Sequence, residues 1–420
     1  MERIERLTPD WLLAPGLQRL LATLSDGGEE ARAIGGAVRN EIMGEPIADV
    51  DVGTTLLPEA VMRRASRAGF HAVPTGIAHG TVTVVVEGAP VEVTTLRRDV
   101  ATFGRHAEVA FTRDWSEDAH RRDLTVNALS LDATGLLHDY VGGIADCRAR
   151  RIRFIGDAGE RMREDYLRIL RFFRIHARYG SGPLDPAGLA AAERERHGLA
   201  VLSAERIQAE LFRLLSAPGV GPVVRAMRPA GILEEVLPAP FDAEALARAV
   251  DADARIAALA GRPAGAPEPR LAALTLTRDA GRAEAIAERL KLSQASRQRM
   301  ARAVAAREAL PLESPAAARA EAYRRGVEPL LDAAILAHAD GVPLAAATAF
   351  LGDAVAFGHA APALPVSGRL LIEAGLAGRG PRLGRLLRTL EGIWIESDFG
   401  ASREELLRTA ARLARGDDEG

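Results

Sequence analysis

Residues 31–52 read ARAIGGAVRNEIMGEPIADVDV, and this stretch decides the fold of the first part of the chain. A short apolar run at residues 31–34 ends in two glycines, and the residues that follow, to 43, have the apolar spacing of a helix. The pattern predicts a strand, a glycine turn and a helix, with a second strand over residues 48–52.

Patterns on both sides of this stretch extend it into a small mixed sheet. Residues 58–68 have helical spacing, and residues 81–87 and 91–96 predict a hairpin that turns at a Gly-Ala-Pro sequence. Two further apolar runs, at residues 128–132 and 136–140, complete the predicted sheet.

After residue 150 the strand patterns disappear, and amphipathic helical patterns continue to the end of the chain. Glycine and proline interrupt them at several points, which we take as seams between domains. The predicted class is α+β multidomain, with a mixed-sheet head followed by helical parts. The predicted domains are a catalytic head (1–150), a helical neck (151–217), a helical body (218–345) and a helical tail (346–420).

Composition limits the possible functions. The 420 residues include 48% hydrophobic and 26% charged residues, as in an ordinary folded protein of several domains. No apolar run is long enough to span a membrane and the first residues are charged, so we expect a cytoplasmic protein with no membrane contact. The single cysteine, Cys147, excludes an internal disulfide and a multi-cysteine zinc site, so any bound metal needs oxygen ligands.

Two aspartates, Asp49 and Asp51, fall two residues apart in the second predicted strand, so their side chains project from one face. Like charges so close together repel each other unless a cation lies between them, and carboxylate oxygens suit magnesium. The alternative is a solvated strand edge or a turn, because Asp-x-Asp matches by chance. In this context the pair is our candidate site for Mg²⁺.

Gly35 and Gly36 stand between the first predicted strand and its helix, shortly before the aspartates. Glycine there lets backbone amides approach an anion, and a helix N-terminus presents free N–H groups and a positive dipole end. Arg39 on the first turn adds a positive charge, which suits a triphosphate. The alternative is a tight turn that needs a positive φ angle.

A third carboxylate, Glu92, lies in the second strand of the predicted hairpin. Alternation puts Val91 and Val93 on the inner face and Glu92 on the opposite face. If that strand neighbours the one that carries Asp49 and Asp51, Glu92 completes the metal site or orients the attacking hydroxyl. Otherwise it is an ordinary solvated side chain.

A series of motifs, in the same order, closely resembles the class II tRNA nucleotidyltransferases, the CCA-adding enzymes. Bacterial poly(A) polymerases share these motifs. The resemblance covers most of the chain. Its motifs are GGAVR (35–39), Gly44, DVD (49–51), RRDLTVNA (121–128), DYVGG (139–143), EDYLRILR (164–171) and the segments 203–211, 232–238 and 375–387.

The resemblance implies an enzyme that adds CCA to the 3′ end of tRNA from CTP and ATP with Mg²⁺ and releases pyrophosphate. It implies that the tail binds tRNA, and it leaves the oligomeric state open. In the RRDLTVNA motif a function for Asp123 rests on the resemblance, because by composition alone this would be an ordinary charged loop. Asn127 in the same motif could hydrogen-bond ribose or backbone, and the alternative is a structural turn. Its implied nucleotide contacts are Gly36, Arg39, Arg122, Asp165, Arg168, Arg171 and Arg174.

Chemistry independently favours base reading by Asp165 and Arg168, three residues apart in a helical pattern. Asp accepts hydrogen bonds and Arg donates them. C and A each present an amine donor beside a ring-nitrogen acceptor, and U and G present a carbonyl beside an N–H. A wrong base leaves buried polar groups unpaired, at a cost of about 1 to 3 kcal/mol each. An arginine-rich solvated helix face is the alternative.

Helical spacing separates the remaining arginines of this segment from the base-reading pair. Residues three apart drift by about 60° at each step, so Arg174 would lie roughly opposite Asp165. One helix face therefore cannot hold all four side chains. We expect Arg171 and Arg174 to meet phosphates or to brace the neighbouring domain.

Two segments bear on how far the resemblance extends. The family usually has aspartate where this chain has Asn40, and we expect an altered hydrogen bond there rather than loss of activity. Residues 97–120 are long and polar, and they resemble a flexible loop near the family's active site.

Other functions remain possible. A poly(A) polymerase, or a relative that adds only CC or only A, would share the motifs. A polymerase acting on many RNAs would need basic extensions, whereas this chain has a net charge of −3 and an acidic end. A noncatalytic RNA-binding protein would have no need of the carboxylate pair.

Overall fold

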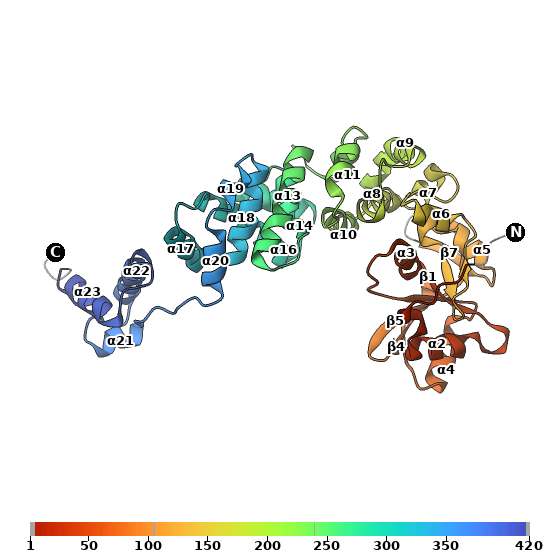
Figure 1. Cartoon of the computed structure of the whole chain (residues 1–420), viewed down its shortest axis with the longest axis horizontal. Helices are drawn as coiled ribbons and strands as arrows, with labels where there is room; N and C mark the ends of the chain where they lie inside the picture. The colour runs from red at the N-terminus through yellow and green to blue at the C-terminus, as the bar shows by residue number, and fades with distance from the viewer. Residues whose placement is uncertain (1–4, 104–105, 239, 417–420) are drawn as a thin grey trace. The chain divides into compact units, whose positions relative to one another are not determined.

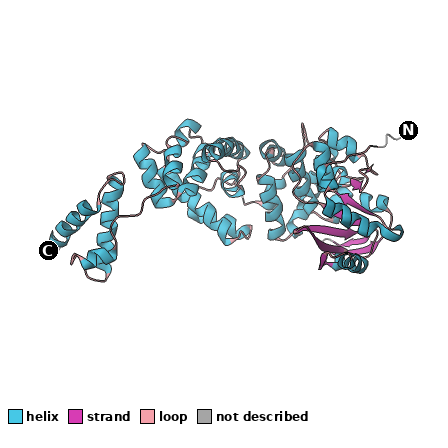
Figure 2. Ribbon diagram, turned by 60° about the horizontal axis from the view of Figure 1, so that its bottom comes forward, coloured by secondary structure: helices cyan, strands magenta, loops and turns pink. Residues whose placement is uncertain are grey.

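The structure, a computed structural model, describes residues 5–103, 106–238 and 240–416. The chain divides into two compact units, Met1–Ala239 and Pro240–Gly420. Among the described residues, strands occur in the first unit alone (Figures 1 and 2). This is the predicted α+β arrangement, a mixed sheet followed by helices. The finer division into head, neck, body and tail remains a prediction.

The strands of the first unit are β1 (Ala31–Ile34), β2 (Asp51–Thr54), β3 (His71–Gly76), β4 (Thr81–Val86), β5 (Ala89–Thr95), β6 (Arg97–Phe103), β7 (His106–Phe111), β8 (Ser130–Asp132) and β9 (Leu137–His138). Within the described residues they form a seven-stranded sheet, ordered β3-β4-β5-β2-β1-β8-β9, and a two-stranded ribbon, β6-β7. β2 and β5 run parallel, and the other pairs are antiparallel.

The helices of the first unit are α1 (Asp10–Leu13), α2 (Pro15–Ser25), α3 (Gly36–Met43), α4 (Pro58–Arg67), α5 (Trp115–His120), α6 (Gly143–Arg148), α7 (Ala158–Glu164), α8 (Leu167–Tyr179), α9 (Pro186–Glu195), α10 (Ala204–Leu215), α11 (Val220–Met227) and α12 (Ile232–Val236). α2 and α4 pack against β4, where Val82, Val84 and Val86 are buried. Alternation turns Thr81 and Thr83 to the opposite face, where they stay partly exposed. That face is available for a site.

The strand that carries the aspartates begins later than predicted. β2 starts at Asp51, so Asp49 lies before the strand and is exposed. The reason is the partner strand: Asp51 pairs with Ile34, the last residue of β1, and Gly35 then turns away with a φ of 68°. Asp49 therefore has no neighbouring strand on that side to pair with.

The described residues of the segment 97–120, which resembles a flexible loop of the family, include two strands and a helix. β6 and β7 pair with each other from Arg97 opposite Phe111 to Phe103 opposite His106. α5 follows, with Asp114 as its N-cap, because the Asp114 side chain accepts a hydrogen bond from the Ser116 N–H.

The described residues of the second unit form helices joined by loops. Val366, Leu371, Leu390 and Trp394 belong to a buried apolar cluster near its end. In the parts of the chain that are described, no helix has the length and apolar character to cross a membrane. Its helices are α13 (Ala243–Ala260), α14 (Pro267–Leu274), α15 (Ala280–Arg289), α16 (Gln294–Ala306), α17 (Pro315–Arg325), α18 (Val327–Ala339), α19 (Leu344–Ala347), α20 (Leu351–Gly358), α21 (Gly368–Glu373), α22 (Pro381–Glu396) and α23 (Arg403–Gly416).

Candidate active site

A cavity of about 600 Å³ in the first unit gathers nearly all of the site residues that the sequence singled out. Its volume suits a ligand the size of a nucleotide. Asp49 lies outside the lining. The predicted residues that line it are Gly35, Gly36, Arg39, Asp51, Glu92, Arg122, Asp123, Asn127, Asp165, Arg168, Arg171 and Arg174. The sequence did not single out the other lining residues, Ile34, Thr81, Thr94, Arg97, Arg121 and Ile175.

The glycine pair forms the turn between β1 and α3. Gly35 has a φ of 68°, which disfavours a side chain, and its N–H donates to the Leu129 carbonyl at 3.0 Å. Gly36 begins α3 and lines the cavity, so the first turn of this helix borders the cavity. The tight-turn reading is confirmed, and it is compatible with an anion site at the same helix end.

Arg39 is buried beside this turn, with 7% of its surface exposed. It donates to Asn127 Oδ1 at 2.6 Å and to Asn40 Oδ1 at 2.9 Å, and its guanidinium lies 3.9 Å from the ring centre of Tyr179. Burial lowers the pKa of Arg39. These three partners, Asn127, Asn40 and Tyr179, carry no charge. A buried cation held by neutral groups is suited to meet an anion.

Asn40 connects Arg39 to the segment that leads to the aspartates. While its Oδ1 accepts from Arg39, its Nδ2 donates to the Pro46 carbonyl at 2.6 Å. An aspartate at this position could accept from Arg39 but could not donate to Pro46. The altered hydrogen bonding expected at Asn40 is thus visible as a link between two parts of the site.

Three carboxylates influence one another at the edge of the cavity. Val52 of β2 pairs with Val93 of the parallel strand β5, so the preceding residues, Asp51 and Glu92, are neighbours on the opposite face. Burial, then the charges of Glu92 and Asp49, raises the pKa of Asp51, and Arg122 acts in the opposite direction. This repulsion is what a divalent cation would relieve, so the residues fit a metal ion.

The acidic groups would supply only part of a metal's coordination shell. Within the described residues, no three His, Cys, Asp or Glu side chains form a group that could hold a metal ion by themselves. Mg²⁺ commonly takes one or two carboxylates and fills its remaining positions with water and substrate phosphate.

Asp118, which the sequence analysis missed, holds the two arginines of the RRDLTVNA motif. Its Oδ1 accepts from Arg121 at 2.7 Å and its Oδ2 accepts from Arg122 at 2.9 Å. The carboxylate is buried; burial raises its pKa, but Arg122 and Arg121 outweigh burial and lower it. The spacing of Asp118 to the two arginines, three and four residues on a helix, was the available signal.

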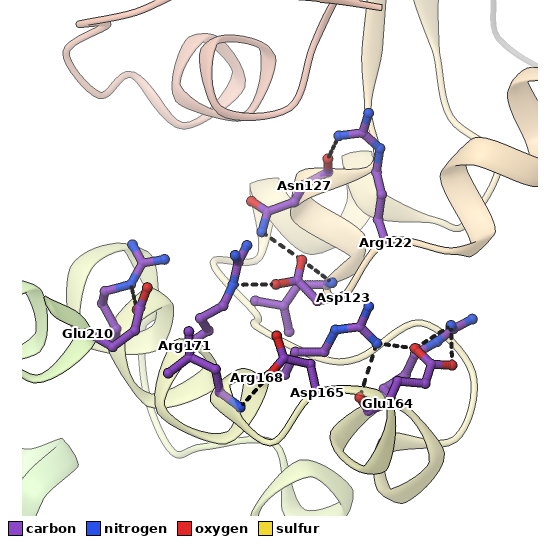
Figure 3. Close-up of polar contacts among 12 residues, drawn as sticks. Arg122, Asp123, Asn127, Glu164, Asp165, Arg168, Arg171 and Glu210 are labelled. Carbon is purple, nitrogen blue, oxygen red and sulfur yellow. Dashed lines mark hydrogen bonds and ion pairs between the residues drawn. The ribbon is translucent and has the colours of Figure 1, made fainter. Parts of the chain in front are cut away.

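Asp123 and Asn127 connect the turn at Arg39 to helix α8. Asn127 Nδ2 donates to Asp123 Oδ1 at 3.2 Å, and Arg171 Nε lies 2.8 Å from Asp123 Oδ2 (Figure 3). Burial raises the pKa of Asp123, but Arg171, Asn127 and Arg168 reverse this and lower it. A buried chain of polar contacts thus runs from Arg39 through Asn127 and Asp123 to Arg171.

The prediction that Asp165 and Arg168 lie on one helix is wrong, because Asp165 lies between two helices. α7 ends at Glu164, Asp165 is extended with φ −155° and ψ 107°, and α8 begins at Leu167. Arg168 pairs with Glu164 (Figure 3), and Asp165 Oδ2 accepts from Arg206 at 2.7 Å. Both residues line the cavity, each held by a different partner.

Asp165, Arg168, Arg171 and Arg174 all line the same cavity, although they do not lie on one helix face. Asp165 sits outside the helix, so helical spacing does not govern its direction. Arg174 is held by Glu210 of α10 at 2.5 Å.

Two models of known protein families match parts of the first unit and the start of the second. A family model described as "Poly A polymerase head domain" matches residues 31–153, and one described as "Probable RNA and SrmB- binding site of polymerase A" matches residues 183–243. The seven-stranded sheet, with Asp51 and Glu92, lies within the range that the first model matches. Nucleotidyltransferases of this kind generally use a divalent metal.

Relatives extend the match over nearly the whole chain. The mitochondrial CCA tRNA nucleotidyltransferase 1 of Danio rerio is 33% identical over 96% of this chain and 91% of its own length. The CCA-adding enzyme of Limosilactobacillus fermentum is 30% identical over 94% of this chain and 96% of its own length. The chain therefore belongs to the family of CCA-adding tRNA nucleotidyltransferases.

Solved structures share the fold. The CCA-adding enzyme of Bacillus stearothermophilus in complex with CTP superposes with a TM-score of 0.75 at 23% identity, covering 98% of this chain and 100% of that chain. The CCA-adding enzyme of Thermotoga maritima complexed with tRNA has a TM-score of 0.68 at 20% identity, covering 97% of this chain and 96% of that chain. At these identities the likeness concerns the fold.

Proposed function

We propose that this protein adds CCA to the 3′ end of tRNA, using CTP and ATP and releasing pyrophosphate. The observation that carries the proposal is the single cavity. It brings the first turn of α3, the carboxylates of β2 and β5, and the Asp165 and Arg168 pair to one ligand-sized space. Relatives that match nearly the whole chain are named for this activity.

We assign the triphosphate and metal roles as follows. Gly36 and Arg39 bind the triphosphate, because a helix N-terminus and a buried cation both favour an anion there. Asp49 and Asp51 hold Mg²⁺, with Glu92 beside them to complete the site or to orient the attacking hydroxyl. When bound, the ion supplies charge neutralisation at the phosphates and lowers the pKa of the attacking hydroxyl.

The base is read by Asp165 as acceptor and Arg168 as donor. This pair matches the amine and ring nitrogen of C and A, and it leaves unpaired groups opposite U or G. Arg122, Arg171 and Arg174 add positive charge to the same cavity. Asp123 and Asn127 use their side chains within the protein, so we assign them to holding Arg39 and Arg171 in place.

The second unit and the location of the protein are part of the same proposal. The helical tail binds tRNA through backbone contacts and shape, since the chain is only 4% aromatic and has few rings for stacking. We keep the cytoplasm as the predicted location, although several relatives are named as mitochondrial enzymes.

One assay tests the function. Transcripts of tRNA that end before CCA or at CC, and an unrelated RNA, are incubated with each labelled nucleoside triphosphate and magnesium, and the added residues are counted. Addition in the order C, C, A supports the proposal. A long A tract on any RNA supports a poly(A) polymerase, and no incorporation supports a binding protein.

A variant tests the metal site. Asp49→Ala should abolish transfer while tRNA affinity stays nearly unchanged, because the carboxylate serves the reaction and not RNA binding. Incorporation is measured with CTP, and tRNA binding by gel shift. Full activity of the variant would show that the metal site has been assigned to the wrong residues.

A further inference from the structure

We infer that Arg206 is a positioning residue for nucleotide selection, because it fixes the carboxylate of Asp165 through which the base is read. This inference rests on the proposed function. Arg206 lies on α10, outside the cavity lining, and it donates from Nη2 to Asp165 Oδ2 at 2.7 Å. It therefore acts through Asp165 and not on the nucleotide.

Asp165 needs such a partner because it belongs to neither helix. It occupies the junction between α7 and α8 in an extended conformation. Its Oδ1 accepts from the Leu167 N–H at 3.1 Å, and Arg206 takes Oδ2. An ionised carboxylate has about four acceptor positions, so these two bonds still leave each oxygen an acceptor position for an amine.

The junction is fixed on its other side by close packing. The Tyr166 ring lies against Gly198, where a Cβ atom would come within 2.1 Å of ring carbons Cδ1 and Cε1. The backbone next to Asp165 is thus held by Tyr166, and the carboxylate by Leu167 and Arg206. Of these contacts, the hydrogen bond from Arg206 is the one that restrains Asp165 Oδ2.

The effect of Arg206 should appear in selectivity more than in stability. Both side chains of the pair are 26% exposed, and exposed ion pairs contribute little to folding, about 0 to 1 kcal/mol. A displacement of about 1 Å in a reacting or reading group, in contrast, can cost up to about a hundredfold in rate. Arg168 has its own partner in Glu164 and stays in place when Arg206 is changed.

The experiment compares kcat/KM for CTP with kcat/KM for UTP on a tRNA that ends before CCA, using the full chain. Arg206→Gln should lower the CTP-to-UTP ratio by roughly tenfold or more, because the acceptor can rotate. Arg206→Lys keeps the charge and should restore part of the ratio. Arg163→Gln is the matched control, since Arg163 pairs with Glu195 in the same unit and is outside the cavity lining.

A double-variant cycle separates positioning from a general effect on folding. In Asp165→Asn the charged partner is gone, so adding Arg206→Gln should leave the CTP-to-UTP ratio where Asp165→Asn alone puts it. Equal loss for CTP and UTP in Arg206→Gln, or an unchanged ratio, would overturn the inference. Failure of the unaltered protein to add C and A would instead overturn the proposed function.

Discussion

Asp118 shows how one buried residue can organise a site that it does not touch. It binds Arg121 and Arg122 through separate oxygens, and both arginines line the cavity. Asp118→Asn removes the charge while keeping the shape. At neutral pH we expect a loss of about 1 to 3 kcal/mol in the free energy of unfolding, because the amide leaves one of the two guanidinium groups without its acceptor and removes the charge from both pairs. Urea unfolding measures it.

The pH dependence of that loss provides an internal check. The folded-state pKa of Asp118 is lowered, so its stabilising effect is complete above the ordinary aspartate value of about 3.9 and is lost as pH falls through the folded-state pKa. The stability gap between the unaltered chain and Asp118→Asn should therefore be full at about pH 7 and shrink below about pH 4. A gap that stays constant throughout would mean that the carboxylate charge is not its cause.

Several residue types of the candidate site could be predicted from the sequence, but the contacts between them could not. The glycine turn and Arg39 follow from local pattern, since a strand, a turn and a helix fix where each side chain points. Asp49 does not, because it lies before β2 and outside the cavity lining. The partners of Arg39 come from residues 127 and 179, far along the chain. No spacing rule relates such positions before the chain is folded.

Gly198 packs against Tyr166 at the junction between α7 and α8. A methyl group there would collide with Tyr166 and push the α7–α8 junction from its place. Gly198→Ala should lower the free energy of unfolding by about 1 to 3 kcal/mol and also reduce discrimination against UTP. Thermal unfolding and the incorporation ratio measure the two effects.

A helix glycine with open space around it is the control. Gly392 lies within α22, and nothing stands within 4 Å of the position that its Cβ would occupy. Gly392→Ala should be neutral, or stabilising by about 0.5 to 1 kcal/mol. Equal destabilisation by the two substitutions would argue against a specific collision with Tyr166.

Elements with strong local signals were predicted well, and those set by tertiary contacts were not. β1 matches its predicted bounds, and the hairpin of β4 and β5 is present. Its turn lies at Glu87 and Gly88 and not at the predicted Gly-Ala-Pro sequence, because Ala89 and Pro90 already pair with β4. The sequence EDYLRILR contains neither glycine nor proline, so nothing in it announced the helix break at Asp165. Contacts from Arg206 and Gly198 hold that break. Likewise, β2 begins at Asp51 because β1 ends at Ile34.

At the scale of the whole molecule, the candidate active site lies in the first unit and the predicted tRNA-binding tail in the second. Every residue that lines the cavity falls in Met1–Ala239. A chain cut after residue 239 should therefore keep magnesium-dependent CTP binding, while its tRNA affinity drops by about tenfold or more as phosphate contacts are lost. Calorimetry with CTP and gel shifts with tRNA measure these quantities. Loss of CTP binding in a fragment that retains its circular dichroism would contradict this division.

The position of Asp165 has a consequence for how selectivity can change. A side chain in the middle of a helix moves only when the whole helix moves. Asp165 instead lies at the junction between α7 and α8, so its position depends on the angle between the two helices. Any substitution that alters this angle shifts the acceptor without touching a base. From the proposed base-reading role of Asp165 we therefore expect that substitutions at distant packing positions can change nucleotide preference, while the side chains that face the substrate stay the same.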